Sequence, residues 1–426
     1  MLAKDKTEFY KSILKKKIRD KGLFYTIKKI ISRILSLDFL IIYPIVSVIC
    51  LIIVIIKPII FIRFGSLNAH KIGPFVMITE MSICEQENGI QPDKKKTLNI
   101  YHLGHANYVC NMQLLKMWSR VLKVIPFAKY FYNVLSHFNF SKAHIISASK
   151  HGRDMYGLLE KTPPHIDFTK NEIIQAKKEL LSMNIKDQDK YVLLINRGNK
   201  YLNIKFPDFN TNHNSFRNSS ISNYLLMAEN LTKKNNTVIR VGQLTDEPIK
   251  SNNKKIIDYD REGFRTDLLD IYLAKNCRYI VGCDTGFAFL PGYLFRKPTV
   301  IVNWAQLEYL IPYLKDWLFL FRKYWLKSEK RFMRVPEIIK SKAGRFHKYI
   351  DYQKQGIELI ENTPEEINEI VDEMEKKLIG KIDYSEEDNH LQKCFWSHFE
   401  KSDLFGVAKG RIGKNFLKNN KDLFLV

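Results

Sequence analysis

The order of apolar and polar residues predicts alternating strands and helices in the middle of the chain. Buried strands are predicted at the largely apolar runs 191–196, 237–241, 256–257, 279–281 and 299–302. The segments between them carry apolar residues three or four positions apart, which is the spacing of a helix buried on one face. Because strands and helices alternate, we predict an α/β fold with a doubly wound parallel sheet over residues 190–304.

The stretch from Arg278 to Trp304 shows this pattern most completely. Its first apolar run ends at Gly282, the polar turn Cys283-Asp284-Thr285-Gly286 follows, and a second strand comes after Pro298. Ligands of such sheets bind beyond the carboxyl ends of the strands, where helix N-termini direct N–H groups towards anions. We therefore predict that Asp284, Thr285 and Gly286 hold a phosphate-bearing ligand. The alternative is a turn that only joins the strand to the helix.

Further signals extend the prediction to both sides of this sheet. Thr169 and Glu172 form a capping box, and residues 362–366 are a second strong helix start. Residues 203–220 are predicted as a long loop that can act as a lid. Before the sheet, strands are predicted at 59–64 and 97–103, with helices at 72–85 and 111–125. The predicted division is a membrane-associating segment, two Rossmann-like domains and a C-terminal helical extension: 1–62, 63–185, 186–345 and 346–426.

The beginning of the chain has the composition of a membrane-associated segment. Residues 1–38 are basic, and residues 39–56 are almost wholly apolar. A helix that crosses a bilayer needs about 20 apolar residues, so this run is of borderline length. Proline removes a helix hydrogen bond, and we predict a re-entrant or interfacial hairpin that bends at Pro44 with both flanks in the cytoplasm. A secretory signal peptide is not indicated, because no small-residue cleavage site follows.

Charge and cysteine content narrow the classes of function. The 426 residues carry a formal net charge of +23, which favours polyanionic partners: an anionic membrane surface or a nucleotide-linked substrate. A lysine-rich genome would give the same composition. Nucleic acid is not an expected partner, because the sequence has no zinc-finger, helix-turn-helix or aromatic RNA-binding motif. The six scattered cysteines include no C-x-x-C pair, which indicates a reducing compartment and no zinc site, and Cys283 is interpreted as a packed thiol.

Several motifs resemble those of a known family. They are Pro164-His165-Ile166-Asp167-Phe168-Thr169, His213 with Phe216-Arg217-Asn218-Ser219, Ile257-Asp258-Tyr259, the run from Arg265 to Leu273, and the run from Glu361 to Ile367. From about Arg63 onwards, and most clearly over 163–304 and 357–378, the chain resembles bacterial glycosyltransferases of surface-polysaccharide synthesis. The alternation over 190–304 also resembles the donor domain of two-Rossmann (GT-B) transferases such as heptosyltransferases. One departure is Lys71-Ile72-Gly73-Pro74, where the family has Arg-Ile-Gly-His, so the role of that histidine does not transfer.

The resemblance implies a transfer of sugar from a nucleotide-activated donor to a lipid-linked glycan acceptor at the cytoplasmic face of the bacterial inner membrane. The donor would bind in the second α/β domain, and the candidate donor-binding residues are Arg197, Asn199, Arg217, Arg240, Gly242, Arg265, Asp267, Asp284, Thr285 and Gly286. The acceptor hydroxyl needs a base, for which Glu80 is the first candidate and His70 and Asp154 are its rivals. No Asp-x-Asp pair indicates a metal, and no cofactor is expected beyond the nucleotide-sugar co-substrate.

Two other classes of function stay open at this point. Sugar-nucleotide 2-epimerases share the two-Rossmann architecture, although they are typically soluble, and the apolar N-terminal run counts against them. A non-catalytic member of a polysaccharide-assembly complex, held at the membrane, is the second alternative.

Overall fold

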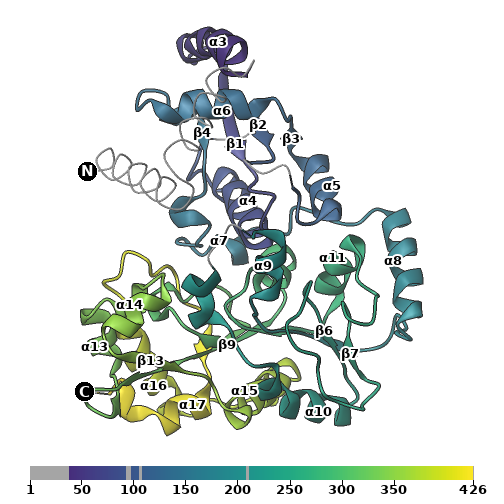
Figure 1. Cartoon of the computed structure of the whole chain (residues 1–426), viewed down its shortest axis with the longest axis vertical. Helices are drawn as coiled ribbons and strands as arrows, with labels where there is room; N and C mark the ends of the chain where they lie inside the picture. Colours follow the sequence, from purple (N-terminus) through teal and green to yellow (C-terminus); the bar gives the residue numbers. More distant parts are fainter. Residues whose placement is uncertain (1–37, 93–96, 105–107, 208–210, 426) are drawn as a thin grey trace. The chain divides into compact units, whose positions relative to one another are not determined.

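The computed structural model describes residues 38–92, 97–104, 108–207 and 211–425 (Figure 1). The chain forms two compact units, which are interleaved in sequence. The first takes in the described residues of 1–66, 94–102 and 124–146, and the second takes in those of 67–93, 103–123 and 147–426. The basic segment 1–37, which is predicted to lie on a membrane, falls outside the described residues.

The first unit is built on a small sheet with the strand order β3-β2-β1-β4. Its strands are β1 (Phe61–Ser66), β2 (Thr97–His102), β3 (Lys123–Val124) and β4 (Ile145–Ile146). β1 runs parallel to β2 on one side and to β4 on the other. The helix α6 (Ala128–His137) packs on β1, where the rings of Phe64 and Phe131 stack at a centroid distance of 5.2 Å. The helix α3 (Tyr43–Ile55) packs in turn on α6 through Val46, Cys50 and Ile53.

The apolar run does not bend at Pro44. A π-helical turn, η1 (Asp38–Ile42), leads directly into α3, and Pro44 lies in the first turn of that helix. The missing N–H of a proline has no helical acceptor at this position, so the residue is tolerated without a kink. The chain turns instead at residues 56–60, before β1 begins. Within the described residues, no helix combines the length and the apolar character needed to cross a bilayer.

The second unit contains a seven-stranded sheet with the order β14-β10-β9-β8-β5-β6-β7, in which every pair is parallel. The strands are β5 (Tyr191–Ile195), β6 (Thr237–Arg240), β7 (Ile256–Asp258), β8 (Ile280–Gly282), β9 (Thr299–Trp304), β10 (Trp317–Phe321) and β14 (Arg411–Ile412). The predicted strands of 190–304 are therefore confirmed, and the fold is α/β with two parallel sheets. β14 comes from the predicted helical extension and adds an edge strand to this sheet.

Helices cover both faces of the seven-stranded sheet (Figure 1). α10 (Leu225–Lys233) and α15 (Pro364–Leu378) pack together on one face, with α17 (Lys414–Asn419) beside α15. The other face carries α11 (Asp267–Asn276) and α12 (Leu290–Phe295). Outside these lie α4 (Ile72–Glu87), α5 (Met112–Val121) and α8 (Lys170–Ser182). The helices α4, α5 and α8 all belong to the second unit. This division does not test the predicted domain boundaries at residues 62, 185 and 345, which remain predictions.

The remaining elements are short. An antiparallel sheet is formed by β11 (Lys323–Leu326), β12 (Arg331–Phe332) and β13 (Ile357–Ile360). The other helices are α7 (Leu158–Lys161), α9 (Lys200–Lys205), α13 (Val335–Lys340), α14 (Tyr349–Lys354) and α16 (Glu386–Ser397). The 3₁₀ turns are η3 (Lys142–His144), η4 (Ser149–His151), η5 (Thr211–Arg217), η6 (Ile221–Tyr224), η7 (Gly286–Phe289), η8 (Leu307–Tyr309), η9 (Ala343–Arg345) and η10 (Lys421–Leu423). The predicted loop 203–220 thus contains the end of α9 and all of η5.

Candidate functional site

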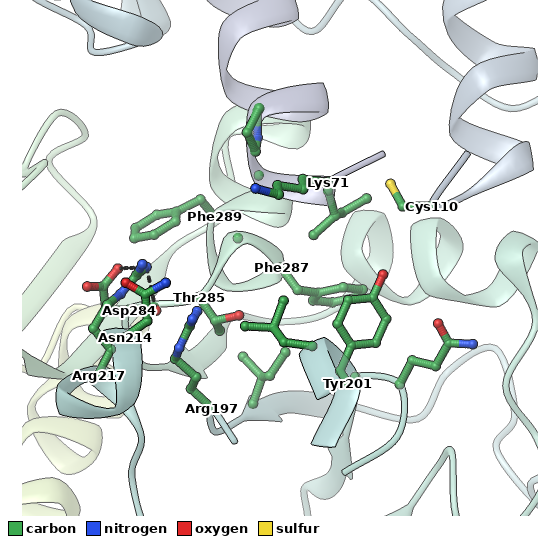
Figure 2. Close-up of a pocket in the computed structure, with 18 of the residues that line it drawn as sticks. Lys71, Cys110, Arg197, Tyr201, Asn214, Arg217, Asp284, Thr285, Phe287 and Phe289 are labelled. Carbon is green, nitrogen blue, oxygen red and sulfur yellow. Dashed lines mark hydrogen bonds and ion pairs between the residues drawn. The ribbon is translucent and has the colours of Figure 1, made fainter. Parts of the chain in front are cut away.

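The strand order creates a switch point beside β5. The chain leaves β5 for β6 and β7 on one side and then returns to form β8 and β9 on the other. In open parallel sheets, ligands bind outside the carboxyl ends of the strands where the order reverses in this way. A cavity of about 1340 Å³ lies at this place, and every residue of its wall belongs to the second unit (Figure 2). Its size suits a ligand larger than a typical drug molecule.

Four strand ends and two helices supply the wall of the cavity. The strand ends contribute Arg197 after β5, Gly242 after β6, the turn 284–286 after β8, and Trp304 at the end of β9. Opposite them in Figure 2 lies Lys71, which directly precedes α4. Tyr201 on α9 and Phe287 on η7 add aromatic surface. The predicted donor-binding residues on this wall are Arg197, Arg217, Arg240, Gly242, Arg265, Asp284, Thr285 and Gly286.

Two guanidinium groups, those of Arg197 and Arg217, lie near the single carboxylate of Asp284 at the centre of the site. Arg217 donates to the Asp284 side chain at 2.5 Å and to the Asp284 backbone carbonyl at 2.9 Å (Figure 2). Arg197 lies close enough to Arg217 and Asp284 for the charges of both to affect its pKa. Two cations and one anion leave a net positive charge at the switch point, which favours a phosphate or another anion.

Arg197 is the cation of this group that is left without a partner. Within the described part of the chain, its guanidinium makes no hydrogen bond and no ion pair, and its Nε is fully buried. Burial, and then the charge of Arg217, lower the pKa of Arg197 to about 10, although Asp284 opposes the change. The group therefore stays protonated at neutral pH. A half-buried cation without a partner among the described residues is costly, so it marks a place where an anionic ligand would be stabilised.

The turn after β8 has fewer free backbone N–H groups than the sequence indicated. The Thr285 N–H already donates to the Cys283 carbonyl at 2.6 Å, so it is not free for a phosphate. The amides of Gly286 and Phe287 begin η7 and have no acceptor within that turn. Gly286 also packs against α4: a Cβ atom at Gly286 would lie 2.6 Å from the backbone nitrogen of Gly73. A glycine is needed here for helix packing, whatever it contributes to a ligand.

The other two arginines of the wall are held in ion pairs. Arg240 is buried and donates to Asp258 at 3.1 Å and to the side-chain oxygen of Asn196 at 2.9 Å. Arg265 donates to Asp270 at 2.7 Å and to Asp267 at 2.9 Å. Burial lowers the pKa of Arg265, but the charges of Asp270 and then Asp267 outweigh this effect, so the pKa of Arg265 is raised. These pairs hold the loops after β6 and before α11, so their cations are already neutralised.

Three further donor-site candidates, Gly242, Asn199 and Asp267, have local features that serve the fold. Gly242 lines the cavity with a φ of +115°, a conformation that favours glycine. Asn199 is not on the wall, and its backbone N–H donates to Asp246 at 2.9 Å. Asp267 is also off the wall, where its carboxylate accepts from the Met112 N–H at 2.7 Å and so ties α5 to α11.

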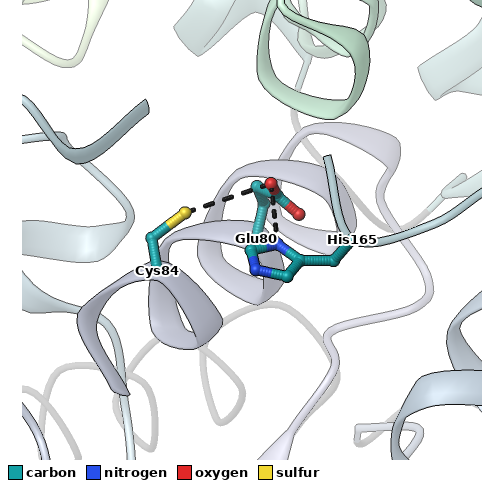
Figure 3. A group of neighbouring side chains, drawn as sticks. All are labelled: Glu80, Cys84 and His165. Atoms are coloured by element: carbon teal, nitrogen blue, oxygen red, sulfur yellow. Dashed lines mark hydrogen bonds and ion pairs between the residues drawn. The ribbon is translucent and has the colours of Figure 1, made fainter. Parts of the chain in front are cut away.

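The structure does not bring Glu80 to the cavity. Its carboxylate is completely buried, accepts from Arg296 at 2.7 Å and lies 3.0 Å from Nδ1 of His165 (Figure 3). Nε2 of His165 lies 3.0 Å from Glu87, so both ring nitrogens face carboxylates. Burial alone would lower the pKa of His165, but Glu80 and then Glu87 outweigh it and raise that pKa. His165, in a motif that carries the family resemblance, therefore pins a loop to α4.

Glu80, Cys84 and His165 have the spacing of a metal site, with ligand atoms within 4.8 Å of one another. Two observations argue against that use. The guanidinium of Arg296 already occupies the Glu80 oxygen and would repel a divalent ion. Burial, reinforced by Glu80, raises the pKa of Cys84 to about 12, so a metal would have to displace a tightly held proton to gain the thiolate. The cluster fits an ion-pair network and not a metal centre.

The two rival bases are also off the wall. Asp154 is buried, and its carboxylate accepts the N–H groups of Leu158 and Leu159, both at 2.8 Å, at the start of α7. His70 is half-buried next to Lys71 and does not line the cavity. Tyr201 and His151 are among the residues that do line the cavity and that reasoning from the sequence missed. Tyr201 follows β5 within a few residues, a place where strand-end reasoning points, whereas His151 carries no comparable signal.

The sequence matches no family model and none of the curated proteins. Among solved structures, the chain overlaps with the crystal structure of the glycosyl transferase family 9 from Veillonella parvula DSM 2008. The TM-score is 0.42 and the sequence identity 11%, over 76% of this chain and 98% of that chain. A similarity at this level carries no argument about the activity of this chain.

Proposed function

We propose that this protein is a metal-independent glycosyltransferase that moves a sugar from a nucleotide-activated donor to a lipid-linked or surface-polysaccharide acceptor. The observation that carries the proposal is the Arg197 cation, which has no partner among the described residues and lies in a large cavity at the switch point of a parallel sheet. A nucleoside diphosphate has the charge that Arg197 and Arg217 would neutralise. The resemblance of the sequence motifs to surface-polysaccharide glycosyltransferases supports a sugar as the transferred group.

The charge arrangement also supports transfer chemistry. When the bond between the sugar and the donor phosphate breaks, negative charge develops on the leaving phosphate oxygen. A fixed cation beside that oxygen stabilises this charge without reorganisation. Arg197 is held in place by burial, and Arg217 is held by Asp284. Both can therefore act on the leaving group, which would explain why two arginines are set against one acid.

A panel of UDP-, GDP-, ADP- and CMP-sugars, each with a lipid-linked acceptor, tests this function. The expected result is release of one nucleotide together with a lengthened glycan. Conversion of the donor to its epimer without nucleotide release would identify a sugar-nucleotide 2-epimerase. Nucleotide binding without any turnover would support the non-catalytic assembly protein, and failure of every nucleotide to bind would overturn the proposal.

We propose further that the first unit rests on the cytoplasmic face of the bacterial inner membrane. α3 is apolar on all sides, but only the stripe Val46, Cys50 and Ile53 is buried. On the opposite side Val48, Ile52 and Ile55 are 59%, 51% and 75% exposed. The hydroxyl of Ser47 donates to the Tyr43 carbonyl at 2.7 Å, so it needs no water. An aliphatic face of this kind without polar groups suits lipid better than a protein partner.

Charge supports an anionic surface for this unit. Its described residues contain Lys57, Arg63, Lys129 and Lys142 but a single acid, Asp38. A 13-residue helix is about 20 Å long, which is too short for the roughly 30 Å of a hydrocarbon core. A helix of this length that is apolar on all sides would fit in the plane of the membrane–water interface. The basic segment 1–37, by its composition, would add to the attraction.

A further inference from the structure

The wall of the cavity offers few groups that can accept a proton at neutral pH. Among its described residues, the carboxylates and imidazoles are Asp246, Asp270, Asp284 and His151. The lysines and arginines of the wall are protonated at that pH, and burial raises the pKa of the Cys110 thiol to about 12. Among the described residues, the candidates for a base at the acceptor hydroxyl are therefore these four, since Glu80, His70 and Asp154 do not line the cavity.

Each of the three carboxylates is already engaged. Asp284 is paired with Arg217 at 2.5 Å. Asp246 accepts the backbone N–H groups of Asn199 at 2.9 Å and Lys200 at 2.7 Å, at the start of α9. Oδ2 of Asp270 is held by Arg265 at 2.7 Å and its Oδ1 is fully buried, although burial raises the pKa of Asp270 to about 7. None of these carboxylates has both of its oxygen atoms free to contact a substrate.

His151 differs from these acids. The residue is exposed and lines the wall, and among the described residues its ring makes no hydrogen bond and no ion pair. The neighbouring Lys150 is engaged with Asp403 at 3.3 Å. An imidazole is a common general base, and this one is the only unengaged carboxylate or imidazole that the described wall contains.

The backbone around His151 is strained and held from both sides. Lys150, His151 and Gly152 all have positive φ values, 44°, 59° and 88°. Such a conformation is unfavourable for residues other than glycine. A Cβ atom at Gly152 would lie 2.9 Å from the Ile78 nitrogen, and the Tyr293 hydroxyl donates to the Gly152 carbonyl at 3.1 Å. Strain of this kind persists only where the surroundings fix it, and it is concentrated at functional sites.

Arg153 supplies the firmest of these anchors. Its guanidinium donates to the backbone carbonyls of Leu404, Tyr309 and Leu310 at 3.0, 2.9 and 2.8 Å. The side chain is buried, so the residue after Gly152 cannot move without breaking three bonds. The backbone of the short loop that carries His151 is thus held rigidly at Gly152 and Arg153.

We propose that His151 is the general base that accepts the proton of the acceptor hydroxyl, an inference that rests on the proposed glycosyltransferase function. A ring nitrogen takes the proton, and the oxygen electron pair forms the new bond to the anomeric carbon of the donor sugar. The bond from that carbon to the donor phosphate breaks, and its electron pair leaves with the phosphate oxygen beside Arg197. The imidazolium then returns its proton to solvent.

The variant His151→Asn tests this role in the full-length protein. Asparagine tolerates positive φ, so the loop keeps its conformation while the base is lost. The expected result is unchanged affinity for nucleoside diphosphate, an unchanged KM for the acceptor, and a kcat that falls roughly 100-fold or more. Added imidazole should restore part of the turnover. His390→Asn, an exposed histidine on α16, is the matched control and should leave kcat unchanged.

Three results separate the possible failures. If the wild-type protein transfers sugar and His151→Asn turns over within a factor of about three of it, the inference is overturned while the proposed function stands. If the variant loses nucleotide affinity together with turnover, His151 is a structural residue and the inference is again overturned. If the wild-type protein binds nucleotides but transfers no sugar to any acceptor, both the inference and the proposed function fail.

Discussion

Gly73 and Gly286 meet backbone to backbone: a Cβ atom at Gly286 would lie 2.6 Å from the Gly73 nitrogen and 2.7 Å from its Cα. The two residues begin α4 and η7, whose first turns both line the cavity. Since neither backbone can yield easily, this contact fixes the spacing of two cavity walls. Replacing Gly286 therefore changes helix packing before it changes ligand binding.

We predict that Gly286→Ala lowers the free energy of unfolding by roughly 1–3 kcal/mol, the usual cost of overpacking. Urea denaturation followed by circular dichroism measures it. Gly263→Ala is the control, because a Cβ atom there would meet nothing within 4 Å and only its φ of +79° is unfavourable. A Gly286→Ala protein as stable as the wild type would show that α4 can move away from η7.

Arg197→Met should raise stability and weaken nucleotide binding at the same time. The substitution removes a half-buried cation, with a fully buried Nε, that has no partner among the described residues, so the ligand-free protein gains stability. A charge-assisted hydrogen bond contributes about 1.5–3 kcal/mol, so affinity for a nucleoside diphosphate should fall roughly 10- to 150-fold. Thermal melting and isothermal titration calorimetry measure the two effects.

Arg217→Met provides the matched comparison for Arg197. It leaves Asp284 buried without its ion-pair partner, so this variant should lose stability instead of gaining it. If both variants changed stability in the same direction, the assignment of Arg197 as the unpartnered cation would be wrong.

The His165 network predicts a pH dependence of stability. Because Glu80 and Glu87 raise the pKa of His165 in the folded protein, the folded state binds the proton more tightly than the unfolded state. This contribution is fully present below the ordinary histidine pKa of about 6.5 and is lost as the pH rises through the higher folded value.

The urea midpoint of the wild type, measured from about pH 6 to about pH 9, should therefore fall more steeply than that of His165→Gln. The variant keeps a polar side chain but has no proton to lose in this range. Parallel curves for the two proteins would mean that His165 is not protonated between Glu80 and Glu87.

Membrane association of the first unit is testable with vesicles. Val48→Glu combined with Ile52→Glu places two charges on the exposed stripe of α3, opposite the residues that pack on α6. Binding of the full-length protein to vesicles with phosphatidylglycerol should fall at least tenfold, since each buried aliphatic side chain contributes about 1.5–3 kcal/mol.

Ile174→Glu is the control for vesicle binding, because Ile174 is 67% exposed on α8 in the second unit. It should bind vesicles as the wild type does. Wild-type protein that fails to sediment with anionic vesicles, or a double variant that binds equally well, would remove the membrane from the proposal. Weaker binding to pure phosphatidylcholine is expected from the basic residues of the first unit.

Local sequence signals predicted the elements of the second sheet well. The capping box of Thr169 and the helix start at residues 362–366 act within one turn, and both are present where expected. The strands β5 to β9 are buried on both sides, which makes them continuous apolar runs. The two-residue strand β14 carries no such run and exists only because β10 offers it an edge.

The site was harder to predict because pairing between distant residues decides it. Strand ends drew attention to Arg197 and Asp284, and a motif of the family resemblance drew attention to Arg217; all three line the cavity. Nothing in the sequence shows that Arg240 is neutralised by Asp258, or that Arg197 has no acidic partner among the residues that the structure describes. Glu80 was chosen for its place on a helix, but its partner Arg296 lies far along the chain and only the fold reveals it.

The interleaved second unit has a consequence for synthesis on the ribosome. α4 packs against α12, yet about 200 residues separate Glu87 from Leu290. At about 5–20 residues per second, α12 emerges roughly 10–40 s after α4. During that interval the apolar side chains of Phe75, Val76 and Met81, all fully buried in the finished fold, have no cover. The nascent chain is therefore a natural client for ribosome-bound chaperones until residue 295 has been translated.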